Sequence, residues 1–155
     1  MINRYSRKQM EDIWKQENRF SAWLKIELAV CEAWTRRGVI PDDSMARIRE
    51  KSSFDVDRIN EIEKTTRHDV IAFTTSVAVF VGEDSRFVHR GLTSYDVVDT
   101  ALSLLMKEAG VLIRKGVLEL MAALKDRAFE TKKVPVVGRS HGIHAEPTTF
   151  GLKLA

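Results

Sequence analysis

Cysteine is nearly absent from this chain, in which Cys31 is the only one among 155 residues. A single cysteine excludes an internal disulfide framework and any zinc site built on several thiolates, and it is typical of a reducing compartment. Long hydrophobic runs are also missing, since the longest, Val77–Val81, is far shorter than a membrane span. The polar N-terminal residues lack the apolar core of a signal peptide. We therefore expect a cytoplasmic protein without a membrane partner.

Charge of one sign is not in excess anywhere along the chain. Lys and Arg number 25 against 22 Asp and Glu, the net charge is +3, and the two signs are interleaved. Because no basic strip forms, the sequence predicts no nucleic-acid partner. Hydrophobic residues make up 44% and charged residues 30%, a composition typical of a globular protein.

Proline is scarce, and its three occurrences fall outside the strongly periodic segments: Pro41, Pro135 and Pro147. Because proline interrupts helix interiors, this distribution favours long helices. We expect Ser6 to cap a first helix. A second helix carries an apolar stripe and should end at Arg36–Gly38, where basic residues precede a glycine. A short helix is expected after Pro41 and another after Asp55.

The segment Val70–Val81 is apolar and β-branched, so a strand and a buried helix both fit its pattern. We interpret it as a helix, because its neighbours are helical and about a dozen residues pass without a turn signal. A loop is expected over Gly82–Arg86.

The strongest pattern runs from Ser94 to about Lys132 and predicts one helix roughly 58 Å long. Apolar residues recur along one side of it: Val98, Ala101, Leu102, Leu105, Ala109, Leu112, Ile113, Val117, Leu120, Leu124 and Ala128. A helix with this stripe needs partner helices from a bundle or from other subunits. A further helix should begin at Pro147, shortly before the last residue, Ala155. We therefore expect the chain to be the N-terminal part of a longer protein.

Three segments collect polar residues at predicted loop-to-helix boundaries. In Thr65–Val70, His68 could act on an anionic substrate, with Arg67 as its charge partner and Asp69 as the group that orients it. The alternative is a helix cap, with Thr66 as the capping residue, and this segment alone favours the cap.

The second segment, His89–Asp96, opens the long helix. Thr93 and Ser94 place hydroxyl groups where backbone N–H groups are unpaired and the helix dipole is positive, which favours a carboxylate or a phosphate. A cap formed by Thr93 with Asp96 three residues later fits the spacing equally well.

The third segment, Val137–Gly151, is predicted to be a loop rich in glycine and in groups that exchange protons. Zinc ligation by His141, His144 and Glu146 is weakly supported, because no HExxH pattern occurs. A deaminase site is excluded by the single cysteine. Dinucleotide, P-loop and nucleophile-elbow motifs are all missing. The interpretation that remains is acid–base chemistry on an anionic substrate, without a metal.

Together, these segments resemble the adenylosuccinate lyases of the fumarase/aspartase superfamily. The resemblance extends from Arg4 to Gly151 and is most specific in Thr93–Thr100 and Gly138–Pro147. The segment Thr66–Val70 resembles the adenylosuccinate lyases more than the other members of the superfamily. It implies an all-α fold with a small N-terminal helical domain over residues 1–92. The first long helix of a central bundle would then begin the incomplete domain over residues 93–155.

The resemblance implies a β-elimination that needs no cofactor. Fumarate leaves adenylosuccinate to give AMP, and it leaves the succinyl-carboxamide ribotide of purine nucleotide biosynthesis. Members of the family are homotetramers whose active sites combine segments of three subunits. The implied partners are therefore a purine nucleotide substrate and further copies of the chain.

Matched residue by residue, the resemblance assigns the general acid to His141 and a second catalytic role to His68. The implied substrate-binding residues are Arg4, Tyr5, Arg67, His68, Asp69, His89, Thr93 and Ser94. Within this set, Thr93 and Ser94 would hold the succinyl carboxylates. Arg4 and Tyr5 would bind the nucleotide end of the substrate.

The family's catalytic base is a serine on a glycine-rich loop far downstream, and nothing in these residues matches that loop. We therefore expect the 155-residue chain to be inactive alone, as part of a C–N lyase. Two alternatives stay open. The chain could belong to another fumarate-releasing lyase, similar to argininosuccinate lyase or aspartase, or it could be a helical assembly fragment without catalysis.

Overall fold

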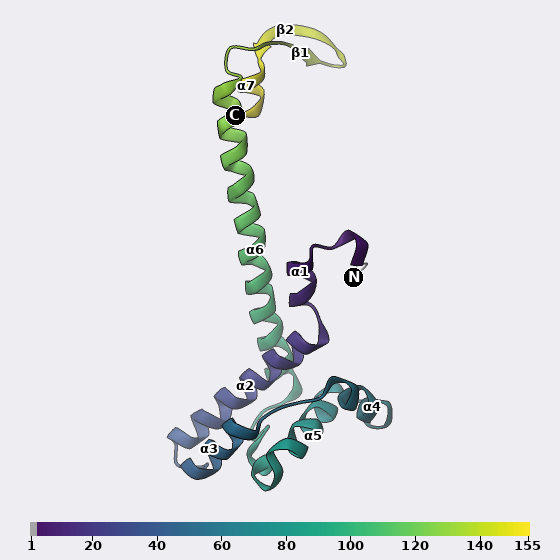
Figure 1. Ribbon diagram of the computed structural model, residues 1–155, viewed down its shortest axis with the longest axis vertical. Coiled ribbons are helices and arrows are strands. Elements are labelled where there is room, and N and C mark those ends of the chain that lie inside the picture. The colour runs from purple at the N-terminus through teal and green to yellow at the C-terminus, as the bar shows by residue number, and fades with distance from the viewer. Residues whose placement is uncertain (1–2) are drawn as a thin grey trace. The chain divides into compact units, whose positions relative to one another are not determined.

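The computed structural model describes residues 3–155 and is mainly helical (Figure 1). In chain order its elements are η1 (Asn3–Tyr5), α1 (Lys8–Ile13), α2 (Gln16–Arg36), α3 (Asp42–Lys51), α4 (Val56–Thr66), α5 (Asp69–Val81), η2 (Gly82–Phe87), α6 (Ser94–Glu130), β1 (Pro135–Ser140), β2 (Ile143–Thr149) and α7 (Phe150–Leu154). The predicted all-α class is confirmed, with one additional two-stranded sheet. None of the helices within residues 3–155 is long and apolar enough to cross a bilayer.

The chain divides into two compact units, one ending at Ala109 and the other formed by Gly110–Ala155. The domain boundary predicted between residues 92 and 93 stays a prediction. In the first unit, α4 packs along α5 and α2 packs against α3 (Figure 1). The second unit contains the distal part of α6, the two strands and α7.

Aromatic side chains form the centre of the first unit. Phe20 and Trp23 of α2 contact Phe73 of α5, and all three are buried. The Phe20 and Phe73 rings stack with their centroids 5.7 Å apart, and Trp23 meets Phe73 edge-on at 5.4 Å. Such aromatic pairs add about 0.5–1.5 kcal/mol beyond the burial of their area. This cluster fixes α5, and hence the residues at its N-terminus, against α2.

The helix interpretation of Val70–Val81 is confirmed by α5. Several of its side chains are fully buried, including Val70, Ala72, Phe73 and Val77. The segment lacks the polar face of an ordinary surface helix because its exposed side also carries apolar residues, among them Ile71, Val79 and Phe80. The helices expected after Pro41 and Asp55 are also present.

Two expectations in this unit are wrong. Ser6 does not cap α1, because the N-cap position belongs to Arg7 and the Ser6 hydroxyl instead lies 3.4 Å from a carboxylate oxygen of Glu11. The segment Gly82–Arg86 is not an irregular loop but most of the 3-10 helix η2. Gly82 has a φ of 76°, so it ends α5 and lets the chain turn directly into η2.

α6 forms one helix over nearly the predicted range, and the first part of the predicted stripe is confirmed, since Ala101, Leu105 and Ala109 are buried. Leu102 is exposed instead, and the core also contains Val97, which the stripe did not include. Beyond Ala109, most of its large apolar side chains are exposed in the structure: Val111, Ile113, Val117, Leu118, Leu120, Met121, Leu124 and Phe129. The packing of this stripe against partner helices stays a prediction.

The predicted loop over Val137–Gly151 is instead a β-hairpin followed by α7. Its strands pair antiparallel across the turn His141–Gly142, where the two φ angles are 53° and 79°. Two consecutive positive φ angles define a type I′ turn, whose twist matches that of paired strands. At Gly138 the register shifts, and a Cβ atom there would lie 2.6 Å from the Glu146 carbonyl oxygen. The glycines therefore shape the hairpin rather than make it flexible.

Pro147 does not begin the last helix, contrary to the sequence prediction. It lies in β2 opposite Val137, and α7 begins at Phe150. A two-stranded sheet has only edge strands, so a residue without an N–H group is tolerated there. The N-cap is Thr149, whose hydroxyl accepts a hydrogen bond from the Leu152 N–H group at 3.3 Å.

The lone cysteine should be chemically inert in the folded chain. Burial, together with the charges of Glu27 and Glu32, raises the pKa of the Cys31 thiol from 9.0 to about 11, and its side chain is 1% exposed. At pH 8, iodoacetamide should therefore modify the folded chain at least about 100-fold more slowly than free cysteine. Mass spectrometry with and without denaturant measures this difference. Equal rates in both conditions would contradict the burial of Cys31.

Candidate active site

An open pocket of about 350 Å³ lies at the N-terminal ends of α5 and α6. It is lined by Glu63, Arg67, His68, Asp69, Ser94, Tyr95 and Val98. The first two polar segments of the sequence thus meet at one place, although 26 positions separate His68 from Ser94. Besides the carboxylates of Glu63 and Asp69, the pocket presents a guanidinium, an imidazole and a hydroxyl group, which can together bind an anion and exchange a proton.

His68 is the N-cap of α5, so the expected cap by Thr66 is wrong. Thr66 is the last residue of α4, and its hydroxyl donates to the Ile62 carbonyl oxygen of its own helix. The His68 Nδ1 atom accepts from the Ile71 N–H group at 3.4 Å. Because a backbone N–H group can only donate, the proton of the neutral ring lies on Nε2, which is 3.4 Å from the Ser94 hydroxyl. Capping and pocket formation are therefore performed by the same imidazole.

Positive φ angles mark all three polar segments. Within residues 3–155, the non-glycine residues with positive φ are Arg67 at 51°, His89 at 64° and His141 at 53°. A side chain in the left-handed region costs about 1–3 kcal/mol and persists only where the surroundings impose it. Two of the three angles follow from local geometry, because Arg67 is the C-cap of α4 and His141 is the first residue of the hairpin turn.

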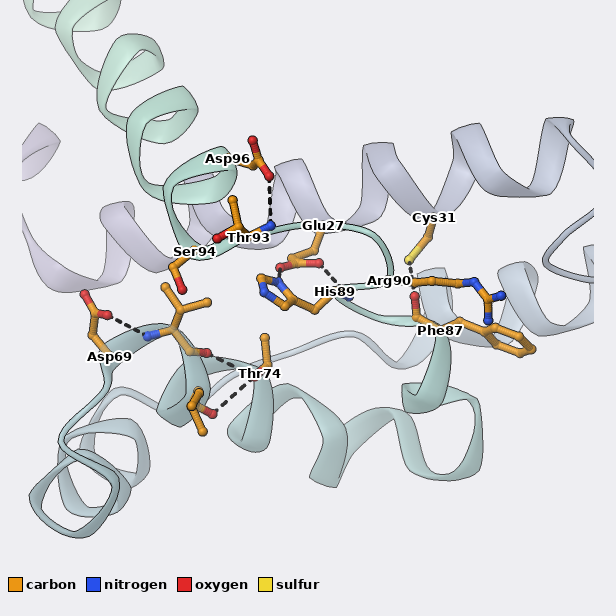
Figure 2. Close-up of polar contacts among 12 residues, drawn as sticks. Glu27, Cys31, Asp69, Thr74, Phe87, His89, Arg90, Thr93, Ser94 and Asp96 are labelled. Carbon is orange, nitrogen blue, oxygen red and sulfur yellow. Dashed lines mark hydrogen bonds and ion pairs between the residues drawn. The ribbon is translucent and has the colours of Figure 1, made fainter.

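The start of α6 combines a cap with a pocket residue. The Asp96 carboxylate accepts from the Thr93 N–H group at 2.8 Å, which is one half of a capping box (Figure 2). Ser94 lines the pocket, whereas Thr93 does not. The part of the cap interpretation that involves Asp96 is thus confirmed, and the capping role of the Thr93 hydroxyl stays a prediction. The Ser94 hydroxyl lies 3.4 Å from the His68 Nε2 atom.

A buried carboxylate that the sequence analysis missed holds His89. Glu27 of α2 is 1% exposed, and its two oxygens bind the His89 N–H group and the His89 ring (Figure 2). One signal was present in the sequence, because Glu27 interrupts the apolar face of α2 between Trp23 and Cys31. The partner could not be predicted, since 62 positions separate it from Glu27.

The nucleotide-binding pair expected from the resemblance lies in η1. Arg4 places its guanidinium 4.8 Å from the centre of the Tyr5 ring, and both side chains are exposed. Neither residue lines the pocket of His68. Their assignment to the substrate's nucleotide end stays a prediction.

His141 occupies the tip of the hairpin in the second unit. Its side chain is exposed, and its Nδ1 atom lies 2.8 Å from the Ser140 hydroxyl. His144 and Glu146 are exposed on β2. Among the residues that the structure describes, no group of three or more His, Cys, Asp or Glu is placed to hold a metal ion.

The family model described as "Lyase" matches residues 3–155. The chain belongs to this lyase family. Over its whole length it is 55% identical to adenylosuccinate lyase of Bacillus subtilis and 54% identical to adenylosuccinate lyase of Streptococcus mutans. It spans 36% of the length of each of these curated relatives.

The fold of this lyase-family chain is also found in a solved structure, that of a fumarate lyase from Mesorhizobium sp. BNC1. The two superpose with a TM-score of 0.89 at 26% identity, covering 97% of this chain and 37% of the other. The helical fold of the lyase family is therefore shown for the matched region, which includes all three polar segments.

Proposed function

We propose that this chain supplies part of the active site of an adenylosuccinate lyase. The observation that carries the proposal is its 55% identity, over all 155 residues, to the Bacillus subtilis adenylosuccinate lyase. The complete enzyme would release fumarate from adenylosuccinate to give AMP. It would act likewise on the succinyl-carboxamide ribotide of purine biosynthesis, in the cytoplasm, without a cofactor and as a homotetramer.

The reaction requires charge stabilisation and two placed proton transfers. A base removes a proton from the carbon next to a carboxylate, and the C–N bond breaks as a general acid protonates the leaving nitrogen. We assign the acid to His141 and a supporting catalytic role to His68. The N–H group at Nε2 of neutral His68 can donate to a substrate oxygen in place of Ser94.

Binding of the substrate's anionic groups is assigned to the residues around this imidazole. Arg67 and Asp69 flank His68 in the pocket, and Ser94, with Thr93, would hold the succinyl carboxylates at the start of α6. The remaining substrate-binding assignments are Arg4, Tyr5 and His89.

A chimera tests the proposal. This chain would replace the matching N-terminal segment of the Bacillus subtilis enzyme, which would supply the rest of the polypeptide. We expect the chimera to release fumarate from adenylosuccinate, and we expect neither the chain nor the remaining Bacillus segment to do so alone. Fumarate is measured by its ultraviolet absorbance.

The controls distinguish the proposal from its alternatives. The intact Bacillus subtilis enzyme sets the reference rate, and argininosuccinate and aspartate are offered as competing substrates. A chimera that folds and assembles like the reference enzyme but releases no fumarate from adenylosuccinate would overturn the proposal. Activity on argininosuccinate or aspartate alone would favour another lyase of the superfamily.

A further inference from the structure

One face of α2 holds the segment Phe87–Arg90, which runs from the last residue of η2 toward α6. Three side chains at successive turns of α2 bind this segment: Glu27, Cys31 and Trp34. The Cys31 thiol lies 3.7 Å from the Phe87 carbonyl oxygen, and the Trp34 indole donates to the Arg90 carbonyl oxygen at 2.9 Å. The segment that carries His89 is therefore attached to a rigid helix on both sides of that residue. Figure 2 shows the contacts of Cys31 with Phe87 and of Glu27 with His89.

The contact between Glu27 and His89 lies at the N-terminal end of this row on α2. A carboxylate that is 1% exposed is costly unless both oxygens are paired. Here Oε2 accepts from the His89 N–H group at 2.8 Å, and Oε1 lies 2.6 Å from the His89 Nδ1 atom. Both oxygens are thus used by a single residue, which also has a φ of 64°.

This geometry assigns a position to the ring proton. The backbone N–H group can only donate, so Oε2 must accept, and an ionised carboxylate makes Oε1 an acceptor as well. Nδ1 then carries a proton in both the neutral and the charged imidazole. The other ring nitrogen, Nε2, is left for an external group, and the side chain is 27% exposed.

We infer that Glu27 is a positioning residue for His89, which fixes the rotamer of the imidazole and keeps the proton on Nδ1. Neutral His89 then presents a lone pair at Nε2, whereas neutral His68 presents an N–H group at its own Nε2. The consequence for turnover rests on the proposed function, in which His89 contacts substrate. The assignment of the tautomer does not depend on the proposed function.

Nitrogen-15 NMR of the histidine-labelled chain measures the tautomer directly. We expect Nδ1 of His89 to have the signal of a protonated nitrogen and Nε2 that of an unprotonated one when the ring is neutral. The variant His89→Gln identifies the resonances by their loss. If wild-type His89 carries its proton on Nε2, or exchanges between tautomers as free imidazole does, the inference is overturned.

The variant Glu27→Gln makes the test sharper. Its amide has one accepting oxygen and one donating nitrogen, and the His89 N–H group needs the oxygen. The NH₂ group then faces Nδ1, so the proton should move to Nε2. The matched control is Glu32→Gln on the same helix, where a half-buried side chain pairs with Arg49 and His89 should not respond. An unchanged His89 tautomer in folded Glu27→Gln would overturn the inference.

Kinetics of the chimera test the consequence for turnover. Glu27→Gln should lower kcat/KM about 10- to 100-fold, by analogy with the loss of a group that orients a metal-ligating histidine. Glu27→Asp, which keeps the charge, should lose less, and Glu32→Gln should be unaffected. If the wild-type chimera is active and the Glu27→Gln variant has the same kcat/KM, the role of Glu27 in turnover is overturned.

The two readouts separate the two proposals. An inactive wild-type chimera would overturn the proposed function and would leave the NMR result intact. Circular dichroism checks folding of each variant. If Glu27→Gln does not fold, the wild-type spectrum still supports or overturns the assigned tautomer.

Discussion

Replacing His141 by asparagine should lower fumarate release by the chimera about 100-fold or more, the typical loss when a general acid is removed. Asparagine is chosen because His141 has a φ of 53° at the first position of a type I′ turn, where asparagine is well tolerated. The hairpin should therefore keep its shape while the proton donor is lost. Initial rates with adenylosuccinate measure the effect.

The matched control for this prediction is His144→Asn. His144 lies on β2 of the same hairpin, is exposed, and has no assigned catalytic role. We expect its replacement to change the rate only slightly. A His141→Asn chimera that assembles normally and turns over at the wild-type rate would contradict the assignment of the acid. It would favour the assembly-fragment alternative.

Phe73→Ala should destabilise the chain by about 3–5 kcal/mol, the cost typical of removing a fully buried aromatic side chain. Phe73 is 0% exposed and contacts the rings of Phe20, Trp23 and Phe54. Its removal leaves a cavity that these rings cannot fill without losing their own contacts. Urea unfolding followed by circular dichroism gives the free energy of unfolding.

The same substitution elsewhere on α5 serves as the control. Phe80 is 41% exposed, so Phe80→Ala should cost only about 1 kcal/mol. Comparable losses for the two variants would show that Phe73 is not the centre of the core. Because α5 begins at the pocket of His68, we also expect Phe73→Ala to disturb the pocket, whereas Phe80→Ala should not.

Local pattern was sufficient to predict most helices of the first unit. Asp55 is followed by a helix that it caps, with its side chain accepting from the Arg58 N–H group at 2.8 Å, and Gly38 follows α2 with a φ of 72°. α5 was predicted from its length, although its composition also allowed a strand. These features depend on neighbours within one or two turns, which the sequence displays directly.

Contacts distant in sequence were not predictable in the same way. The capping pattern at Thr66 competed with a less common cap, an imidazole, which also lies beside Ser94 of a later helix. Likewise, the His141–Gly142 turn lacks the usual Asn-Gly signal of a hairpin, so the third polar segment was interpreted as a loop. In both places, the residue that departs from the common pattern is a histidine of the candidate site.

The row formed by Glu27, Cys31 and Trp34 constrains how α2 can change during evolution. Each residue added to a helix turns everything beyond it by about 100°. A single insertion between Glu27 and Cys31 would therefore separate the contact of Glu27 from the contacts of Cys31 and Trp34. Either the first contact or the other two could stay in place, but not all three. Substitutions can accumulate on the exposed side of α2, whereas its length between these residues has to be inherited unchanged.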